Sequence, residues 1–258
     1  MEAFAAQLEH TDREFGRIVE FLEKIGELVN TLLIVTSAHG ACAEGGMSGL
    51  HNEAASFNSQ TVSFESNLRF IDEWGGPNTV NHFHTGWGMA GNSPFPYYKH
   101  HADGGTHVPF IIYWPERIRE AGVRTQYHHI IDVAPTILDA VGIEPPEVVD
   151  GVPQLPHDGM SMTYTFDAPD APEQRTLQYY EIWGNRGMYK DGWKAVTIHN
   201  HIMPWRPPIA ASLDDDVWRL YHVDEDFSES IDLAAERPDK LKELQDAWAI
   251  EAERYGVY

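Results

Sequence analysis

The first part of the chain carries two different hydrophobic patterns. Over residues 4–25, apolar side chains recur every three or four positions with charged residues between them, which predicts an amphipathic helix that ends at Gly26. Residues 31–36 form instead a continuous run of apolar and β-branched side chains, which predicts a strand buried on both faces, as in a parallel sheet. Because ligands gather beyond the carboxyl ends of such strands, the small-residue loop 37–46 is a candidate site.

The middle of the chain is harder to assign. Residues 47–107 show little periodicity and are rich in Gly, Asn, His and aromatic side chains, and a long irregular stretch of this kind is usually functional. Residues 108–114 then predict a second buried strand. A helix is expected over residues 132–141, with Asp132 as its N-cap and Gly142 as its end.

The last third of the chain predicts an antiparallel unit. Proline and acidic residues crowd the segment after the predicted helix, and we take residues 144–175 as a linker. Short strands and a final helix follow it, at residues 178–183, 187–189, 193–199, 218–223 and 238–254. The pattern indicates an α/β protein, with part of an α/β core over residues 1–143 and a small C-terminal antiparallel sheet-plus-helix subdomain over residues 176–258.

Composition narrows the classes of function. The chain of 258 residues has 18 Lys and Arg against 40 Asp and Glu, a formal net charge of −22, so we expect no nucleic-acid partner. Cys42 is the only cysteine, which excludes an intrachain disulfide and a cysteine-cluster zinc site. The sequence has no run of about 18 apolar residues and no signal peptide, so we expect no membrane partner and a cytoplasmic location.

Short motifs follow one another along the chain in a characteristic order. They are Ser37-Ala38-His39-Gly40-Ala41, Tyr98-Lys99, Gly104-Gly105, Val108-Pro109, Trp114-Pro115, Asp132-Val133-Ala134-Pro135-Thr136, Asp191-Gly192-Trp193-Lys194, Leu220-Tyr221-His222-Val223-Asp224 and Asp232-Leu233-Ala234. In this order and spacing, across essentially the whole chain, they resemble the C-terminal half of a bacterial arylsulfatase of the alkaline phosphatase superfamily. The resemblance implies a partial alkaline-phosphatase-like α/β sandwich, whose active site collects residues from both halves of a longer chain.

The resemblance also implies a function, that of a sulfuric-ester hydrolase acting on a sulfate-ester small molecule. In the family, the Cys or Ser of a Cys-x-Pro-x-Arg or Ser-x-Pro-x-Arg motif is oxidised to formylglycine, which attacks sulfur; Cys42 does not match that motif. We therefore expect an internal start or an expressed fragment that lacks the nucleophile and is inactive alone. It should expose apolar surface, and form a dimer or pair with the missing N-terminal half. Two alternatives stay open: a phosphonate or phosphodiester hydrolase, and a non-catalytic degenerate sulfatase fragment.

The loop after the first predicted strand bears on metal binding. Ser37-Ala38-His39-Gly40 stands where arylsulfatases have Ser-Asp-Asn-Gly and related phosphonate and phosphodiester hydrolases have Ser-Asp-His-Gly, and in both the Asp and the next residue bind a divalent metal. By resemblance His39 is a metal ligand, with Ca²⁺ the cofactor expected in intact family members. Ala38, however, stands in the Asp position and supplies no carboxylate for a hard cation. The alternative is that His39 is a loop histidine without a ligand role.

Lys99 is the candidate catalytic and substrate-binding residue. It stands just ahead of Gly104-Gly105, which is the place of the family's sulfate-binding lysine. A compact ammonium suits a tetrahedral oxyanion, and near the bridging oxygen it stabilises the leaving group. His101 follows closely enough to reach the same pocket and is a second substrate-binding candidate. The alternative for Lys99 is an ordinary solvated lysine.

Histidines and aromatic residues crowd the loops around these candidates. Nine of the 14 histidines fall between His39 and His129. His82-x-His84 and His100-His101 could hold Zn²⁺ or Ni²⁺ at exposed sites, although loop or packed histidines are the favoured interpretation. The aromatic residues either wall a pocket for a hydrophobic sulfate ester or close the core beneath the loop: Trp74, Phe83, Trp87, Phe95, Tyr97 and Tyr98. The sequence around Glu44-Gly45-Gly46 does not match a phosphate-binding loop, so this segment is not a candidate site.

Overall fold

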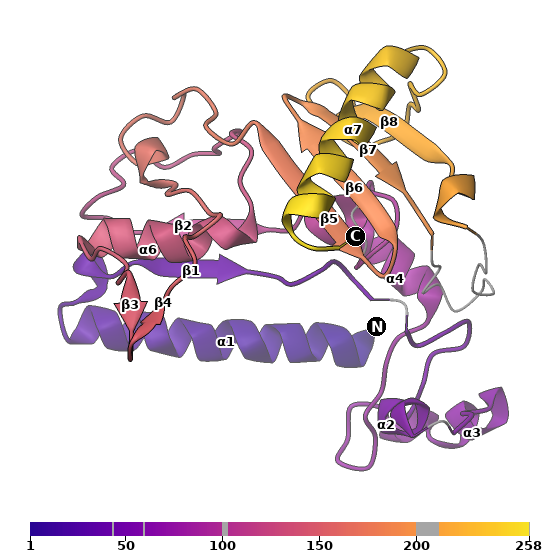
Figure 1. Ribbon diagram of the computed structural model, residues 1–258. Helices are drawn as coiled ribbons and strands as arrows, with labels where there is room; N and C mark the ends of the chain where they lie inside the picture. The colour runs from indigo at the N-terminus through magenta and orange to yellow at the C-terminus, as the bar shows by residue number, and fades with distance from the viewer. Residues whose placement is uncertain (43, 59, 100–102, 200–211, 258) are drawn as a thin grey trace.

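The computed structural model describes residues 1–42, 44–58, 60–99, 103–199 and 212–257. Its larger elements form two groups, which lie on opposite sides of Figure 1. The N-terminal layer contains α1 (Glu2–Lys24), β1 (Leu33–Thr36), β2 (Phe110–Tyr113) and α6 (Val133–Val141). The C-terminal module contains β5 (Leu177–Ile182), β6 (Asn185–Lys190), β7 (Trp193–Thr197), β8 (Trp218–His222) and α7 (Pro238–Arg254).

β1 and β2 form a two-stranded antiparallel sheet, with Thr36 opposite Phe110. The prediction of parallel strands buried on both faces is therefore wrong for the described chain. A continuous apolar run shows which faces can be buried, but the direction of a strand depends on the partner it meets. Near this sheet, Trp114, Ala140 of α6 and Phe166 form a buried cluster, yet no residue of β1 or β2 is itself buried.

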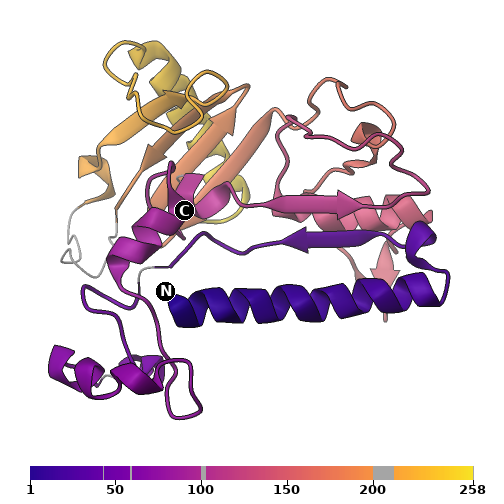
Figure 2. The same cartoon turned by 180° about the vertical axis from the view of Figure 1, so that it is seen from behind.

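α1 confirms the predicted amphipathic helix, and Gly26 follows its end with a φ of +80°. It runs alongside β1 and β2 in both Figure 1 and Figure 2. None of its 23 residues is buried, and Phe4, Leu8 and Phe21 remain 45%, 60% and 59% exposed. The helix therefore presents its apolar stripe largely to solvent.

α6 begins after its N-cap residue Asp132 and ends at Gly142 in the left-handed conformation, both as predicted, although the Asp132 side chain makes no capping hydrogen bond. His129 instead caps the 3-10 turn that precedes the helix. The fully buried Asp132 carboxylate forms an ion pair with Arg175 and accepts the backbone N–H of Met160 at 2.8 Å. A buried guanidinium must be neutralised locally, so the Asp132 carboxylate pairs with Arg175 and does not cap α6.

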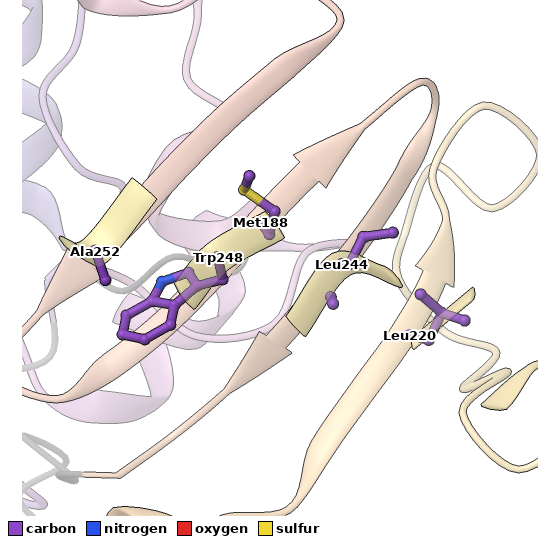
Figure 3. Packing of buried hydrophobic residues seen from close by; sticks show 6 residues of the cluster. Met188, Leu220, Leu244, Trp248 and Ala252 are labelled. Atoms are coloured by element: carbon purple, nitrogen blue, oxygen red, sulfur yellow. The ribbon is translucent and has the colours of Figure 1, made fainter. Parts of the chain in front are cut away.

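The C-terminal module is a four-stranded antiparallel sheet in the order β5-β6-β7-β8, with α7 packed across one face. These elements confirm the predicted short strands and final helix. Figure 3 shows the core between sheet and helix, formed by Met188, Ala195, Leu220, Leu244, Trp248 and Ala252. Because residues four apart share one face of a helix, Leu244, Trp248 and Ala252 all point into this core. The module therefore buries its own apolar face.

Between β1 and β2 the chain forms short helices, so the expectation of an irregular stretch is only partly right. They are α2 (Glu53–Phe57), α3 (Phe64–Arg69), α4 (Thr85–Asn92) and α5 (Asp103–Thr106). After α6, a short hairpin of β3 (Val148–Val149) and β4 (Val152–Pro153) occupies part of the predicted linker, whose bounds stay a prediction. No helix in the described ranges is long and apolar enough to cross a membrane.

Candidate active site

The loop that follows β1 is held by α4 and by close backbone packing. At the end of α4, the Asn92 side chain accepts the N–H of Ala41 at 2.6 Å and donates to the carbonyl of Ala41 at 2.8 Å. Gly40 has a φ of +76°, and a Cβ there would lie 1.9 Å from the carbonyl oxygen of Gly104. Only glycine fits this contact, through which the loop after β1 packs directly on the segment that leads into β2.

Lys99 lies beside this contact. Its backbone N–H donates to the carbonyl oxygen of His39 at 3.0 Å, and its φ of +54° is uncommon for a residue with a Cβ. Its ammonium forms an ion pair with Glu44. Burial opposes the charge, but the hydrogen bond and charge of Glu44 outweigh it, so the pKa of Lys99 lies above its usual value. The structure thus brings together Lys99 and His39, two candidates chosen from separate motifs.

His39 and Cys42 are neighbours within the loop, with His39 Nδ1 3.3 Å from Cys42 Sγ. Burial, together with the negative charge of Glu44, raises the pKa of Cys42 to about 12. The thiol is therefore protonated at neutral pH, whereas the thiolate is the nucleophilic form of cysteine. This arrangement does not activate Cys42 as a nucleophile.

The residues around His39 do not fit a divalent metal on their own. Ala38 has no donor in its side chain, and the carbonyl oxygen of His39 already accepts the N–H of Lys99. Within the described ranges, no three His, Cys, Asp or Glu side chains gather where they could hold a metal ion. A hard cation such as Ca²⁺ takes six to eight oxygen ligands, which this loop does not provide.

The other histidine candidates are dispersed. His84 caps α4 through its ring, and the Nε2 of His82 faces Glu44 and Glu53 at 3.8 and 3.9 Å. The His82-x-His84 pair therefore does not converge on one ligand. His101, with its neighbour in the His100-His101 pair, lies outside the described residues.

The aromatic residues divide between the two predicted roles. Tyr98 is fully buried and packs against Cys42, so it belongs to the core beneath the loop. Phe95 stacks on the ring of His107 at a centroid distance of 4.8 Å. Trp87 is 45% exposed and remains available to a ligand.

Sequence reasoning missed two residues of this site. Asn92 gives no motif signal, because a side-chain clamp on a distant backbone leaves no local pattern. Glu44 stands beside two glycines, a combination that suggests a phosphate-binding loop and gives no sign of an ion pair with Lys99. The structure shows that the chain next to Glu44 is tightly packed, because a Cβ at Gly45 would lie 2.0 Å from the carbonyl oxygen of Phe83.

Comparison with known proteins assigns the chain to a family. The sulfatase family model matches residues 1–143, and a second model, N-sulphoglucosamine sulphohydrolase, C-terminal, matches residues 98–249. The chain belongs to the sulfatase family, whose members are generally metal-dependent.

Individual relatives agree with this assignment. The chain is 27% identical over 267 residues to an uncharacterized sulfatase of Schizosaccharomyces pombe, covering 100% of this chain and 44% of that protein. It is 27% identical over 172 residues to an arylsulfatase of Klebsiella aerogenes, covering 63% and 34%. An N-acetylglucosamine-6-O-sulfatase of Bacteroides thetaiotaomicron is 24% identical over 255 residues, covering 95% and 34%. The chain thus spans less than half the length of these relatives.

Solved structures show the same fold. A Bacteroides thetaiotaomicron sulfatase from a study of glycosaminoglycan metabolism superposes with a TM-score of 0.57 at 19% identity, covering 92% of this chain and 42% of that one. A second structure, a complex with its substrate D-glucosamine-2-N,6-O-disulfate, gives a TM-score of 0.52 at 21% identity, covering 95% and 38%. These likenesses support the fold alone.

Proposed function

We propose that this chain supplies the sulfate-binding part of a sulfuric-ester hydrolase, with Lys99 as the cation that contacts the sulfate group. The observation that carries the proposal is the backbone hydrogen bond of 3.0 Å from Lys99 to His39, which joins two motifs of the family at one place. His101, two residues beyond Lys99, is a second candidate contact to the substrate. The names of the matching relatives and the sulfated sugar in one solved complex support a sulfate ester as ligand.

The chemistry of Lys99 suits this role. A lysine ammonium is a compact point charge with three donors, and it stabilises the negative charge that develops on the departing ester oxygen. Its raised pKa keeps it charged at neutral pH. The described part of the chain contains no activated nucleophile near Lys99, because the Cys42 thiol is protonated. We therefore expect binding without turnover from this chain alone.

The proposal also concerns the divalent metal that intact relatives are expected to hold. Ca²⁺ is the expected metal of intact relatives and His39 the candidate ligand, but the donors around His39 do not fit it in this chain. Sulfate binding is accordingly assigned to Lys99 without a contribution from metal.

Calorimetric titration with 4-nitrophenyl sulfate tests the proposal. A charged hydrogen bond contributes about 1.5–3 kcal/mol, so Lys99→Ala should weaken binding at least about tenfold. Lys190→Ala is the matched control, because Lys190 pairs with Glu243 on the C-terminal module. No nitrophenolate should be released. Unchanged affinity in Lys99→Ala would refute the sulfate role, and hydrolysis of a phosphodiester by this chain would favour the alternative hydrolase class.

A further inference from the structure

Glu44 gives the Lys99 site an unusual charge balance for a site that binds anions. One carboxylate oxygen, Oε1, pairs with the Lys99 ammonium. The other, Oε2, is buried and has no hydrogen-bond donor in the described part of the chain. Burial opposes the charge on Glu44, but the hydrogen bond from Lys99 outweighs it and lowers the pKa of this carboxyl group. The carboxylate therefore stays charged at neutral pH.

A second carboxylate and a histidine lie next to Glu44. The Nδ1 of His82 lies 3.1 Å from the carbonyl oxygen of Phe83, which can only accept a hydrogen bond, so Nδ1 carries a hydrogen. The Nε2 of the same ring faces Glu44 at 3.8 Å and Glu53 at 3.9 Å. The Lys99 ammonium therefore shares its surroundings with the carboxylates of Glu44 and Glu53.

The Glu44 carboxylate is held close to the Lys99 ammonium. Gly45 packs so closely that an added Cβ would lie 2.0 Å from the carbonyl oxygen of Phe83. Lys99 is fixed from the other side by its backbone hydrogen bond to His39. An anion that reaches the ammonium must therefore approach Glu44 as well.

We propose that Glu44 is a specificity-determining residue, which shifts the selectivity of the Lys99 site away from doubly charged phosphate monoesters and toward singly charged sulfate esters. This inference rests on the proposed function, in which Lys99 contacts the anion. A sulfate monoester carries a single negative charge, whereas a phosphate monoester carries about 1.5–2 at pH 7. Coulombic repulsion scales with ligand charge, so Glu44 repels the phosphate ester nearly twice as strongly.

The test compares two esters of one alcohol, 4-nitrophenyl sulfate and 4-nitrophenyl phosphate, at pH 7.5. The chain has only six lysines, so selective ¹³C labelling at lysine Cε gives few NMR signals, and Lys99→Arg identifies the Lys99 signal. In Glu44→Gln the sulfate ester should bind about threefold tighter and the phosphate ester about tenfold tighter, because doubling the ligand charge squares the factor. Glu44→Asp keeps the charge and should keep the wild-type preference.

Glu20→Gln is the control, since it removes the same net charge from an exposed position on α1 and should change neither affinity. Equal gains for both esters, or losses for both, in Glu44→Gln would overturn the discrimination. A Lys99 signal that responds to neither ester in any variant would instead refute the anion site itself. If Glu44→Gln does not fold, Glu44→Ala provides the same comparison against Glu44→Asp and should show the same shift toward phosphate.

Discussion

Helices α1 and α7 are both amphipathic, yet they end up in opposite environments. α7 buries Leu244, Trp248 and Ala252 against the C-terminal sheet, whereas α1 buries no residue at all. The strands differ in the same way, because every residue of β6 except Lys190 is buried and none of β1 is. An amphipathic pattern therefore establishes that a helix forms and which face is apolar, while the cover for that face depends on the surface it meets.

The surface area of the whole chain agrees with this contrast. A compact monomer of 29.2 kDa is expected to expose about 11,500 Å². The chain exposes 16,084 Å². The excess of roughly 4,600 Å² is several times the ~800 Å² that each partner buries in a standard protein interface. This excess agrees with the unburied residues of α1 and β1, whereas the C-terminal module encloses its own core.

The largest predicted effect belongs to the core of the C-terminal module. Trp248→Ala should lower the free energy of unfolding by about 3–5 kcal/mol, because it leaves a cavity between α7 and the sheet. Ile250→Ala, on the same helix but 67% exposed, should change it by less than about 0.5 kcal/mol. Chemical denaturation followed by far-UV circular dichroism measures the free energy of unfolding of both variants. Similar losses in the two variants would contradict the assignment of the core.

The second effect concerns the contact between the C-terminal module and α5. Lys194 of β7 is buried and pairs with Asp103 of α5 and with Glu229. Lys194→Met removes the positive charge that pairs with two buried carboxylates in this cluster, and should cost about 3 kcal/mol of unfolding free energy. Lys242→Met, at an exposed position on α7, is the control and should be nearly neutral. A neutral Lys194→Met would contradict the stabilising role of these buried ion pairs.

Acid should destabilise the chain by protonating the buried carboxylates of Asp103 and Asp132. Lys194 holds the pKa of Asp103 below its usual value against the effect of burial, and His128 and Arg175 do the same for Asp132. A lowered pKa means stability that is complete above the unfolded value of about 3.9 and is lost as the pH falls through the folded value. The raised pKa of Glu229 works in the opposite direction. Denaturation at pH 7, 4 and 2.5 should show the loss, and a flat profile would exclude these pairs as its source.

The smallest effect on stability is expected in α1. Replacing Leu8 and Phe21 together by Gln should change the free energy of unfolding by no more than about 0.5 kcal/mol per site, because both side chains are exposed. The same replacement should reduce binding of a hydrophobic dye and self-association in sedimentation experiments. A large loss of stability, or wild-type dye binding, would show that α1 is covered within the chain.

The sequence predicted local structure better than contacts between distant segments. The spacing of Leu241, Leu244 and Trp248 identified α7, and Gly142 identified the end of α6, because both signals are local in the sequence. The predicted parallel direction of β1 was wrong, because the direction depends on a partner strand more than 70 residues away. Asp132 was placed correctly at the start of α6, but its ion pair with Arg175, 43 residues away, was not predicted.

The residues of the candidate site show the same difference between local signals and distant contacts. Lys99 and His39 were found through motif order, and the structure brings their backbones together. Asn92 and Glu44 were not found, because their contacts with Ala41 and Lys99 join segments with no shared sequence pattern. Residues that hold a site through the backbone of another loop become visible only when the fold is known.

Amide hydrogen exchange tests the contrast between α1 and α7 most directly, at a concentration where the chain is monomeric. Helix α7 should exchange only when the whole C-terminal module unfolds, whereas α1, which lacks buried contacts, should open locally. The account predicts exchange in α1 at least about a hundredfold faster than in the central turns of α7. Equal protection in the two helices would contradict it, because α1 would then be packed as firmly as the C-terminal core.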